Sequence, residues 1–174
     1  MADTDYIKPD QMEGFKYVAK FREYLDYLEE HLENVRRAFN QLTVACKDLW
    51  WVKNDVTWYI LKQQVCVHDI SKFSKEEFVE YQRAFFPVGA TKPLKKAWEH
   101  HKKYNTHHHE SLEDELDVVH MVIDWTAMGY KFGDTAQEYY ERNKDKITLT
   151  DKQKKIMYEI FDRVQKAHIH EHNT

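Results

Sequence analysis

The sequence contains little glycine, proline or cysteine. Its 174 residues include four glycines, three prolines and two cysteines. So few turn-forming residues argue against a turn-dense β-sandwich and against a glycine-rich nucleotide-binding fold. The two cysteines, Cys46 and Cys66, are too few for a secreted disulfide framework, so we expect a reducing, cytoplasmic environment.

Long apolar runs and basic blocks are also missing. No segment approaches the roughly 18 apolar residues of a membrane span, and the N-terminal stretch lacks the apolar region of a signal peptide. The formal net charge is −4, and no cluster of lysine and arginine stands out. We therefore expect a protein that uses neither a membrane nor duplex nucleic acid as a partner.

Charged and aromatic residues are abundant, at 32% and 14% of the chain. Apolar residues recur at steps of three and four, which is the pattern of helices that bury one face. We predict an all-α protein, an irregular bundle of six or seven helices. Its parts are a polar leader over residues 1–12, one helical domain over 13–167 and a frayed, histidine-rich tail over 168–174.

The first predicted helix begins near Glu13 and carries a long apolar stripe. The stripe consists of Val18, Phe21, Leu25, Leu28, Leu32, Val35, Phe39 and Leu42. His31 follows Leu28 by three residues and precedes Val35 by four, so its side chain should lie in the same buried seam.

Capping residues mark the predicted starts of the later helices. Asn54 is a predicted N-cap. Pairs that fit the capping box are Ser74 with Glu77, Ser111 with Asp114, Asp134 with Gln137, and Thr150 with Gln153.

The segment Val67-His68-Asp69-Ile70-Ser71-Lys72-Phe73 follows the helix that begins at Asn54. His68 and Asp69 offer a nitrogen ligand and an anionic oxygen ligand in adjacent positions, a combination that suits Zn, Fe and Mn. Successive helical residues diverge by about 100°. Both side chains can therefore bind metal only if an ion lies between them, or if Asp69 bridges two ions.

Two histidine doublets follow in a segment that begins near Pro93. If its helix persists, His101, Asn105 and His108 share one face, and His100 and His107 lie on a neighbouring face. We expect one histidine of each doublet to face a common pocket. His109 and the tail histidines, which are His168, His170 and His172, should face solvent.

Three polar residues lie on the predicted helix that follows. Asp117, His120 and Asp124 stand at positions i, i+3 and i+7, so Asp117 and His120 could form a helical metal-binding pair with Asp124. Asp124 lies beside Ile123 and should be partly buried, whereas Asp117 comes early in the helix and is expected to be exposed. A buried carboxylate without a positive partner costs several kcal/mol, so Asp69 and Asp124 need Lys72 or a metal nearby.

The order His, His-Asp, Asp resembles that of the HD-domain superfamily of metal-dependent phosphohydrolases, and His68 to Lys72 resembles its H-D-x-x-K pattern. More narrowly, the chain is similar over about residues 20–165 to a small uncharacterised family of bacteria and phages, described only as a domain of unknown function. The similar segments are residues 31–35, 68–73, 97–101, 105–108, 124–125, 132–134 and 140–144.

This resemblance implies an HD-domain-like fold and a divalent transition metal, as one ion or two. The first ion would be held by His31, His68, Asp69 and Asp124. A second ion would need two central histidines, for which we choose His101 and His108. Two-metal members commonly place these histidines further apart, so His100 and His107 stay open as alternatives. The ligand types do not distinguish Mn, Fe, Co and Zn, and Mg is also compatible.

The leading hypothesis for function is a phosphohydrolase, either a phosphatase or a phosphodiesterase, acting on a small phosphorylated metabolite such as a nucleotide. Lys72 would hold the phosphate, Asn105 would orient water or substrate, and His107 would protonate the leaving oxygen. The alternatives are an HD-type di-iron oxygenase and a non-catalytic module that binds a metal or a nucleotide. A homodimer is left open.

Overall fold

The computed structural model describes the backbone of residues 9–91 and 93–172, and the side chains of residues 12–91 and 93–167. Throughout these residues the regular structure is helical, which confirms the predicted fold class. The elements are α1 (Pro9–Ala45), α2 (Trp50–Lys53), α3 (Asp55–Cys66), the 3₁₀ helix η1 (Ile70–Phe73), α4 (Phe78–Phe85), α5 (Lys95–Tyr104), α6 (Glu115–Phe132), α7 (Ala136–Asn143) and α8 (Asp151–His172).

These ranges correct the predicted number of helices and two predicted boundaries. The described chain has eight α-helices rather than six or seven, because the single turn of α2 precedes α3. α1 begins at Pro9, earlier than the predicted Glu13. α8 continues to His172, so the backbone of the predicted tail is helical as far as that residue, while its histidine side chains lie outside the described ones.

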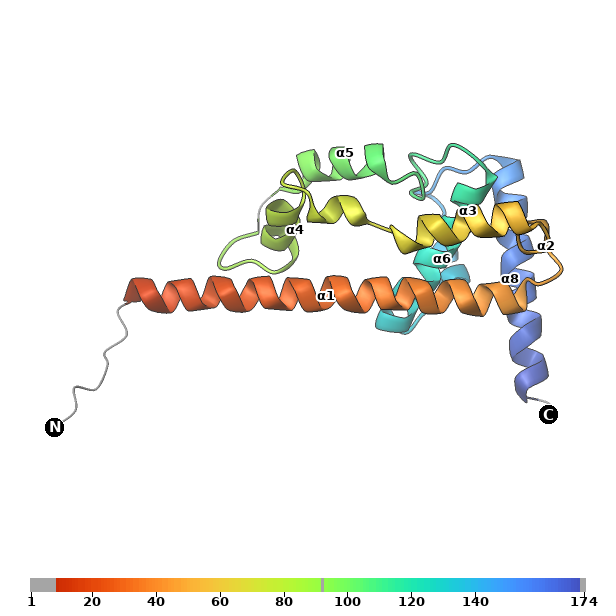
Figure 1. Cartoon of the computed structure of the whole chain (residues 1–174), viewed down its shortest axis with the longest axis horizontal. Helices are drawn as coiled ribbons and strands as arrows, with labels where there is room; N and C mark the ends of the chain where they lie inside the picture. The colour runs from red at the N-terminus through yellow and green to blue at the C-terminus, as the bar shows by residue number, and fades with distance from the viewer. Residues whose placement is uncertain (1–8, 92, 173–174) are drawn as a thin grey trace.

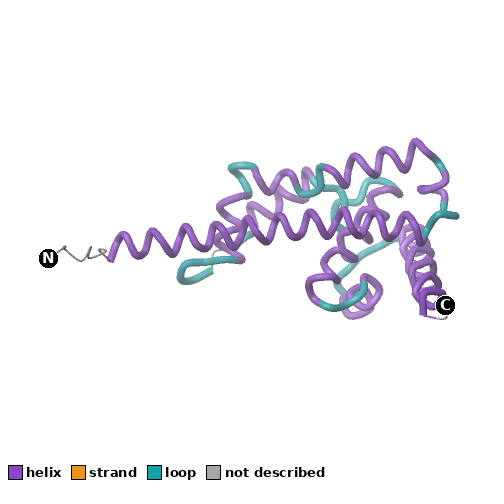
Figure 2. The backbone as a smooth tube through the Cα atoms, turned by 60° about the horizontal axis from the view of Figure 1, so that its bottom comes forward, coloured by secondary structure: helices purple, strands orange, loops and turns teal. Residues whose placement is uncertain are grey.

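α1 is a long, straight helix that runs along the length of the described molecule (Figure 1). Its C-terminal half packs against α3, α6 and α8, and α4 packs nearer its N-terminal end. Figure 2 shows the same arrangement from a second direction, with α8 lying across the C-terminal end of α1. None of the described helices combines the length and the apolar composition needed to cross a bilayer.

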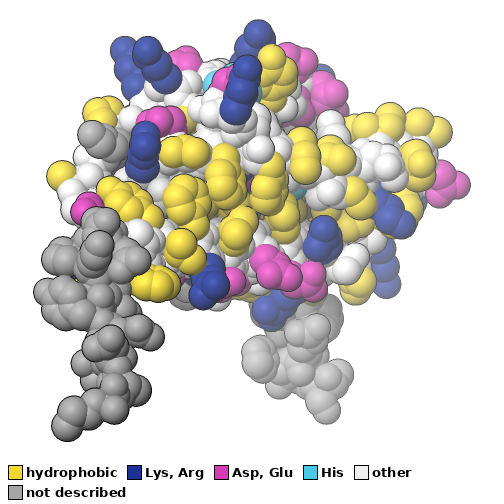
Figure 3. Space-filling model, turned by 60° about the vertical axis from the view of Figure 1, so that its left-hand side comes forward, with side chains coloured by type: hydrophobic (Ala, Val, Ile, Leu, Met, Phe, Trp, Pro, Cys, Tyr) yellow, Lys and Arg dark blue, Asp and Glu magenta, His cyan; other side chains and the backbone are white. Residues whose placement is uncertain are grey.

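The buried face of α1 differs from the predicted stripe in the N-terminal half of the helix. Val18 and Leu25 are exposed, whereas Tyr24 is fully buried. Hydrophobic side chains also gather on the surface at this end of the molecule (Figure 3). From Leu28 onward the prediction is confirmed for Leu28, Val35, Phe39 and Leu42, because this part of α1 has helices packed against it.

Buried apolar side chains form two separate clusters. The larger one joins α1, α3, α6 and α8 through residues that include Leu42, Leu61, Ile123 and Ile160. The smaller one consists of Tyr24, Leu28, Tyr81 and Ala97. His31 lies between Leu28 of the smaller cluster and Val35 of the larger one, so a polar site forms where the two apolar clusters meet.

Two of the predicted caps are confirmed. The side chain of Asn54 accepts hydrogen bonds from the backbone N–H groups of Val56 and Thr57 at the start of α3. Thr150 and Gln153 exchange reciprocal side-chain to backbone bonds at the start of α8.

The other three capping predictions are wrong. α6 is capped by Asp114 with Asp117, and α7 by Thr135 with Glu138, so these boxes lie three residues and one residue later than predicted. α4 begins only at Phe78 and has no side-chain cap, because the Glu77 side chain points into the site described next.

Candidate metal centre

The chain turns sharply at the predicted His-Asp pair. α3 ends at Cys66, Asp69 adopts a left-handed conformation with φ 55°, and η1 follows. Aspartate tolerates this region better than most residues because its short polar side chain bonds locally. The turn removes the angular divergence expected on a helix, and His68 Nε2 lies 3.4 Å from Asp69 Oδ2.

Cluster 1 contains the four residues predicted to hold the first metal: His31, His68, Asp69 and Asp124. The Nε2 atom of His31 lies 3.0 Å from His68 Nε2, 3.5 Å from Asp69 Oδ2 and 3.4 Å from Asp124 Oδ1. His68 Nε2 lies 3.6 Å from Asp124 Oδ1. Two ligands bound to one ion at about 2.1 Å are separated by about 3.0 Å at 90° and about 3.4 Å at 109°. The spacing in cluster 1 therefore suits a single metal ion.

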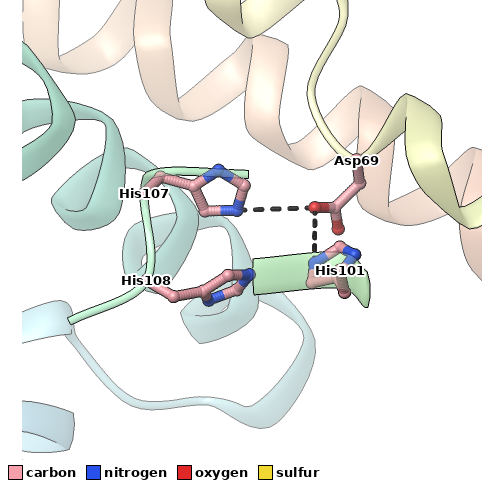
Figure 4. Close-up of side chains that lie close together, drawn as sticks. All are labelled: Asp69, His101, His107 and His108. Atoms are coloured by element: carbon pink, nitrogen blue, oxygen red, sulfur yellow. Dashed lines mark ion pairs between the residues drawn. The ribbon is translucent and has the colours of Figure 1, made fainter. Parts of the chain in front are cut away.

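Cluster 2 gathers around the other carboxylate oxygen of Asp69, and its side chains are drawn in Figure 4. Its members are Asp69, His101, His107 and His108, whose ligand atoms lie within 4.8 Å of one another. Asp69 Oδ1 is 3.2 Å from His101 Nε2 and 3.4 Å from His107 Nε2. Because Oδ2 faces cluster 1 and Oδ1 faces cluster 2, Asp69 is placed to bridge two ions.

The histidine doublets contribute in a way that helical spacing does not anticipate. Of the first doublet, His101 enters cluster 2, while His100 is hydrogen-bonded to Glu77. Of the second doublet, both His107 and His108 enter, because α5 ends at Tyr104 and the chain turns before them. His109 is only a quarter exposed and lines the adjoining cavity, so its predicted exposure to solvent is wrong.

Five ligand atoms of the two clusters are buried and, within the described residues, form no hydrogen bond of good geometry, although Asp69 Oδ1 lies within ion-pair distance of His101 and His107. They are Asp69 Oδ1, Asp124 Oδ1 and the Nε2 atoms of His101, His107 and His108. Buried polar atoms in proteins are nearly always hydrogen-bonded, so five exceptions in one place call for a ligand. Imidazole and carboxylate together suit divalent transition metals, and the residues therefore fit the predicted metal.

Neighbouring groups of opposite charge stabilise the ionised forms of Asp69 and His68. Burial alone would raise the pKa of Asp69, but His68 and Lys72 outweigh it and hold that pKa well below its usual range. Burial would lower the pKa of His68, but Asp69 and Asp124 raise it to about 9. A metal must therefore displace a proton from His68 at neutral pH.

His120, which the sequence offered only as part of a metal-binding pair with Asp117, lies beside His68 and also groups with His68 and His107, and its contact with His68 was not predicted. Its Nε2 atom is 3.0 Å from His68 Nδ1. Burial holds the pKa of His120 well below its usual value, so the ring is neutral and can accept the Nδ1–H of His68. This bond leaves His68 Nε2 free for cluster 1, which is how outer residues commonly orient metal-binding histidines. The available signal was that His120 precedes Asp124 by one helical turn.

Asp117 is buried, contrary to its predicted exposure. Its carboxylate accepts hydrogen bonds from the hydroxyl of Thr106 and from the backbone N–H groups of Glu113 and Asp114. These bonds tie the segment that carries His107 to the start of α6.

Glu77 is fully buried beside His101. One carboxylate oxygen lies 2.8 Å from His101 Nδ1 and the other 2.6 Å from His100 Nδ1. Burial would raise the pKa of Glu77, but the bonds from these two histidines bring it below its usual value. As an ionised acceptor, Glu77 holds the proton of His101 on Nδ1 and leaves Nε2 facing Asp69.

Substituting Glu77→Gln should weaken metal binding at cluster 2 by roughly 10- to 100-fold, because a neutral amide is a poorer acceptor for a metal-binding histidine. Titration of metal-free protein with Mn²⁺ or Zn²⁺ measures this change. Cluster 1 should keep its affinity, since Glu77 contacts none of its imidazoles. The matched control is Glu76→Gln, because Glu76 precedes Glu77 in the sequence and its carboxylate is half-exposed. Unchanged affinity at both clusters in Glu77→Gln would contradict this role.

A cavity of about 650 Å³ opens beside both clusters. Lys72 lies in its wall with Nζ 2.5 Å from Asp69 Oδ2. Aromatic residues supply much of the remaining wall, namely Tyr24, Tyr27, Tyr81, Phe85, Trp98, Trp125, Phe132 and Tyr139. A second cavity, of about 780 Å³, is lined by α1, α6 and α8 and by the start of α7, and contains no residue of either cluster.

One family model matches the chain, and its description is "Family of unknown function (DUF5662)". It covers residues 20–172 and therefore every residue of the two clusters. Neither the curated proteins nor the solved structures contain a match. These comparisons do not show membership of the HD-domain superfamily that the sequence resembles.

Proposed function

The chain belongs to DUF5662, a family of unknown function, and we propose that it is a metal-dependent phosphohydrolase acting on a small phosphorylated substrate, in the first place a nucleotide. The observation that supports this most directly is the pair of clusters joined by Asp69 at the wall of a cavity that Lys72 also lines. An HD-domain-like arrangement of the same residues is part of the proposal.

In this proposal cluster 1 holds one divalent ion and cluster 2 holds another. Bound ions at such a site neutralise phosphoryl oxygens and lower the pKa of a water ligand toward neutrality. Asp69 would contribute one oxygen to each ion, and the other ligands of both clusters would come from buried side chains at the cavity wall.

Lys72 would receive the negatively charged phosphoryl group. Burial opposes its charge, but Asp69 raises its pKa, so the ammonium group is retained. A protonated lysine has no lone pair for a metal and acts as a compact cation toward phosphate.

The other two residues first considered for catalysis fit positioning and metal binding better. Asn105 is buried and donates to the Ser71 hydroxyl at 2.7 Å and to the His101 carbonyl at 2.8 Å, so we propose that it supports His101. Burial and the nearby charge of His68 lower the pKa of His107, so its ring is neutral. A neutral ring in cluster 2 suits a metal ligand more than an acid for the leaving oxygen.

The aromatic wall favours a nucleotide among small phosphates. Trp98, Trp125 and Tyr139 line a cavity whose size suits a small ligand, and they would supply apolar ring surface to a base. Arg142 lies at the same wall, paired with Asp134. It supplies a further cation for a substrate with more than one phosphate.

A di-iron oxygenase is the second candidate, favoured by one observation. The two clusters contain five imidazoles and two carboxylates, a nitrogen-rich set that suits iron as well as manganese or zinc. A binding module without turnover needs only the same ligands and the cavity.

Anaerobically purified protein should release phosphate from nucleoside phosphates when loaded with Mn²⁺, Fe²⁺, Co²⁺ or Zn²⁺ and kept free of oxygen. Elemental analysis of the purified protein, together with a phosphate assay over a panel of phosphate esters, measures this. Oxygen consumption by the iron form without phosphate release would favour the oxygenase. Stoichiometric metal binding without either activity would favour the binding module.

A further inference from the structure

Two buried tyrosine hydroxyls beside the clusters lack hydrogen bonds. Tyr24 of α1 is fully buried and Tyr81 of α4 is 4% exposed. Neither hydroxyl oxygen has a partner within the described part of the chain. Both side chains line the same cavity as Lys72 and the metal clusters. Since a buried tyrosine usually finds a partner for its hydroxyl, the pair points to a ligand group in that cavity.

Packing accounts for the rings of these tyrosines but not for their hydroxyls. The Tyr24 ring lies 5.3 Å from the Phe78 ring, and the Tyr81 ring lies 5.8 Å from the Phe85 ring in a stacked arrangement. Phenylalanine would preserve these contacts and would remove an unsatisfied polar atom, which favours stability. The two hydroxyls therefore lower the stability of the protein unless a group in the cavity accepts hydrogen bonds from them.

The charges nearby define what that acceptor is. A tyrosine hydroxyl is protonated at neutral pH, so each can donate one hydrogen bond. Lys72 Nζ lies 5.4 Å above the Tyr81 ring centroid. Two O–H donors and one ammonium group beside a metal site match an anion with several acceptor oxygens.

We propose that Tyr24, Tyr81 and Lys72 form an oxyanion subsite that binds the phosphoryl group of the substrate next to the metal clusters. The inference rests on the proposed function for the choice of phosphate as the anion. Its remaining support comes from the two unpaired hydroxyls and from the cavity they share with Lys72.

The test uses inorganic phosphate as the probe and full-length, Mn²⁺-loaded protein. Tyr24→Phe and Tyr81→Phe should each raise the dissociation constant for phosphate by roughly ten- to a hundredfold, as expected for a bond to a charged group. Lys72→Met should also raise the dissociation constant for phosphate. Without phosphate, the melting temperatures of both Phe variants should equal or exceed that of the wild type, and their metal content should be unchanged. Calorimetric titration and thermal denaturation measure these quantities.

Tyr130→Phe is the matched control. The Tyr130 hydroxyl donates to Gln41 in the second cavity, so its loss should lower the melting temperature and leave phosphate affinity unchanged. Wild-type affinity in both Phe variants, no phosphate binding by the wild type, or a lowered melting temperature with lost metal would each overturn the subsite.

The two proposals fail separately. Tyrosine-dependent phosphate binding without hydrolysis of any ester would support the subsite and reject the hydrolase. If the protein hydrolyses an ester, but both Phe variants bind phosphate as tightly as the wild type, the hydrolase is supported and the subsite is overturned.

Discussion

Replacing Asp69 with asparagine should remove the metal from both clusters and reduce metal-dependent activity by roughly a thousandfold or more, because bound ions supply several kcal/mol of transition-state stabilisation. Asp69 is the one residue that contributes an oxygen to each cluster, with Oδ2 facing His31 and His68 and Oδ1 facing His101 and His107. An amide carries no negative charge, and its nitrogen has no lone pair to offer a metal.

Asparagine is the right replacement because it tolerates the left-handed backbone at φ 55°. The fold should therefore persist, and circular dichroism should show native helix content. Elemental analysis and the phosphate assay measure the loss. Asp114→Asn is the control, since asparagine caps a helix as well as aspartate does. Two equivalents of metal with full activity in Asp69→Asn would reject the bridging role of Asp69.

Removing the metal should lower the melting temperature of the wild-type protein by roughly 8–16 °C. Metal at a thousand times its dissociation constant stabilises a protein by about 4 kcal/mol, and 1 kcal/mol corresponds to about 2–4 °C for a domain of this size. The physical reason is the set of buried ligand atoms that lack hydrogen bonds when no ion is bound. Thermal denaturation of chelated protein, followed by stepwise addition of Mn²⁺ or Zn²⁺, measures the effect.

The gain in stability on adding metal should also depend on pH. Without metal the pKa of His68 is raised to about 9. The proton on His68 therefore favours the metal-free fold, and this contribution is lost as pH rises from about 6.5, the pKa of an unperturbed histidine, toward 9. Metal must displace the same proton, so the stabilisation by metal should grow over that range. Asp69→Asn should show no response to metal, and an equal response in both proteins would contradict the assignment of the site.

The sequence by itself determined the helical class, the seam that contains His31, and the four residues of cluster 1. The helical class and the seam follow from local rules, whereas the four residues of cluster 1 were chosen because the order His, His-Asp, Asp resembles that of the HD-domain superfamily. Apolar residues at helical period must face a core, and a histidine at i+3 and i−4 within that stripe must face it too. His68, Asp69 and Asp124 add the ligand types that an interior cation requires. The caps at Asn54 and Thr150 were predictable for the same reason, because each involves only neighbouring residues.

Only the tertiary structure decided which outer residues complete the site. α5 ends at Tyr104, and the turn after it brings both His107 and His108 to Asp69, which helical spacing from His101 does not show. Glu77 does not take its predicted capping role, because its buried carboxylate is hydrogen-bonded to two histidines of another helix. The unpaired hydroxyls of Tyr24 and Tyr81 could not be predicted from the sequence, because nothing in it shows whether the hydroxyl of a buried tyrosine has a hydrogen-bond partner. Partners that come from separate helices depend on how those helices pack, and this packing is not encoded within any one local pattern.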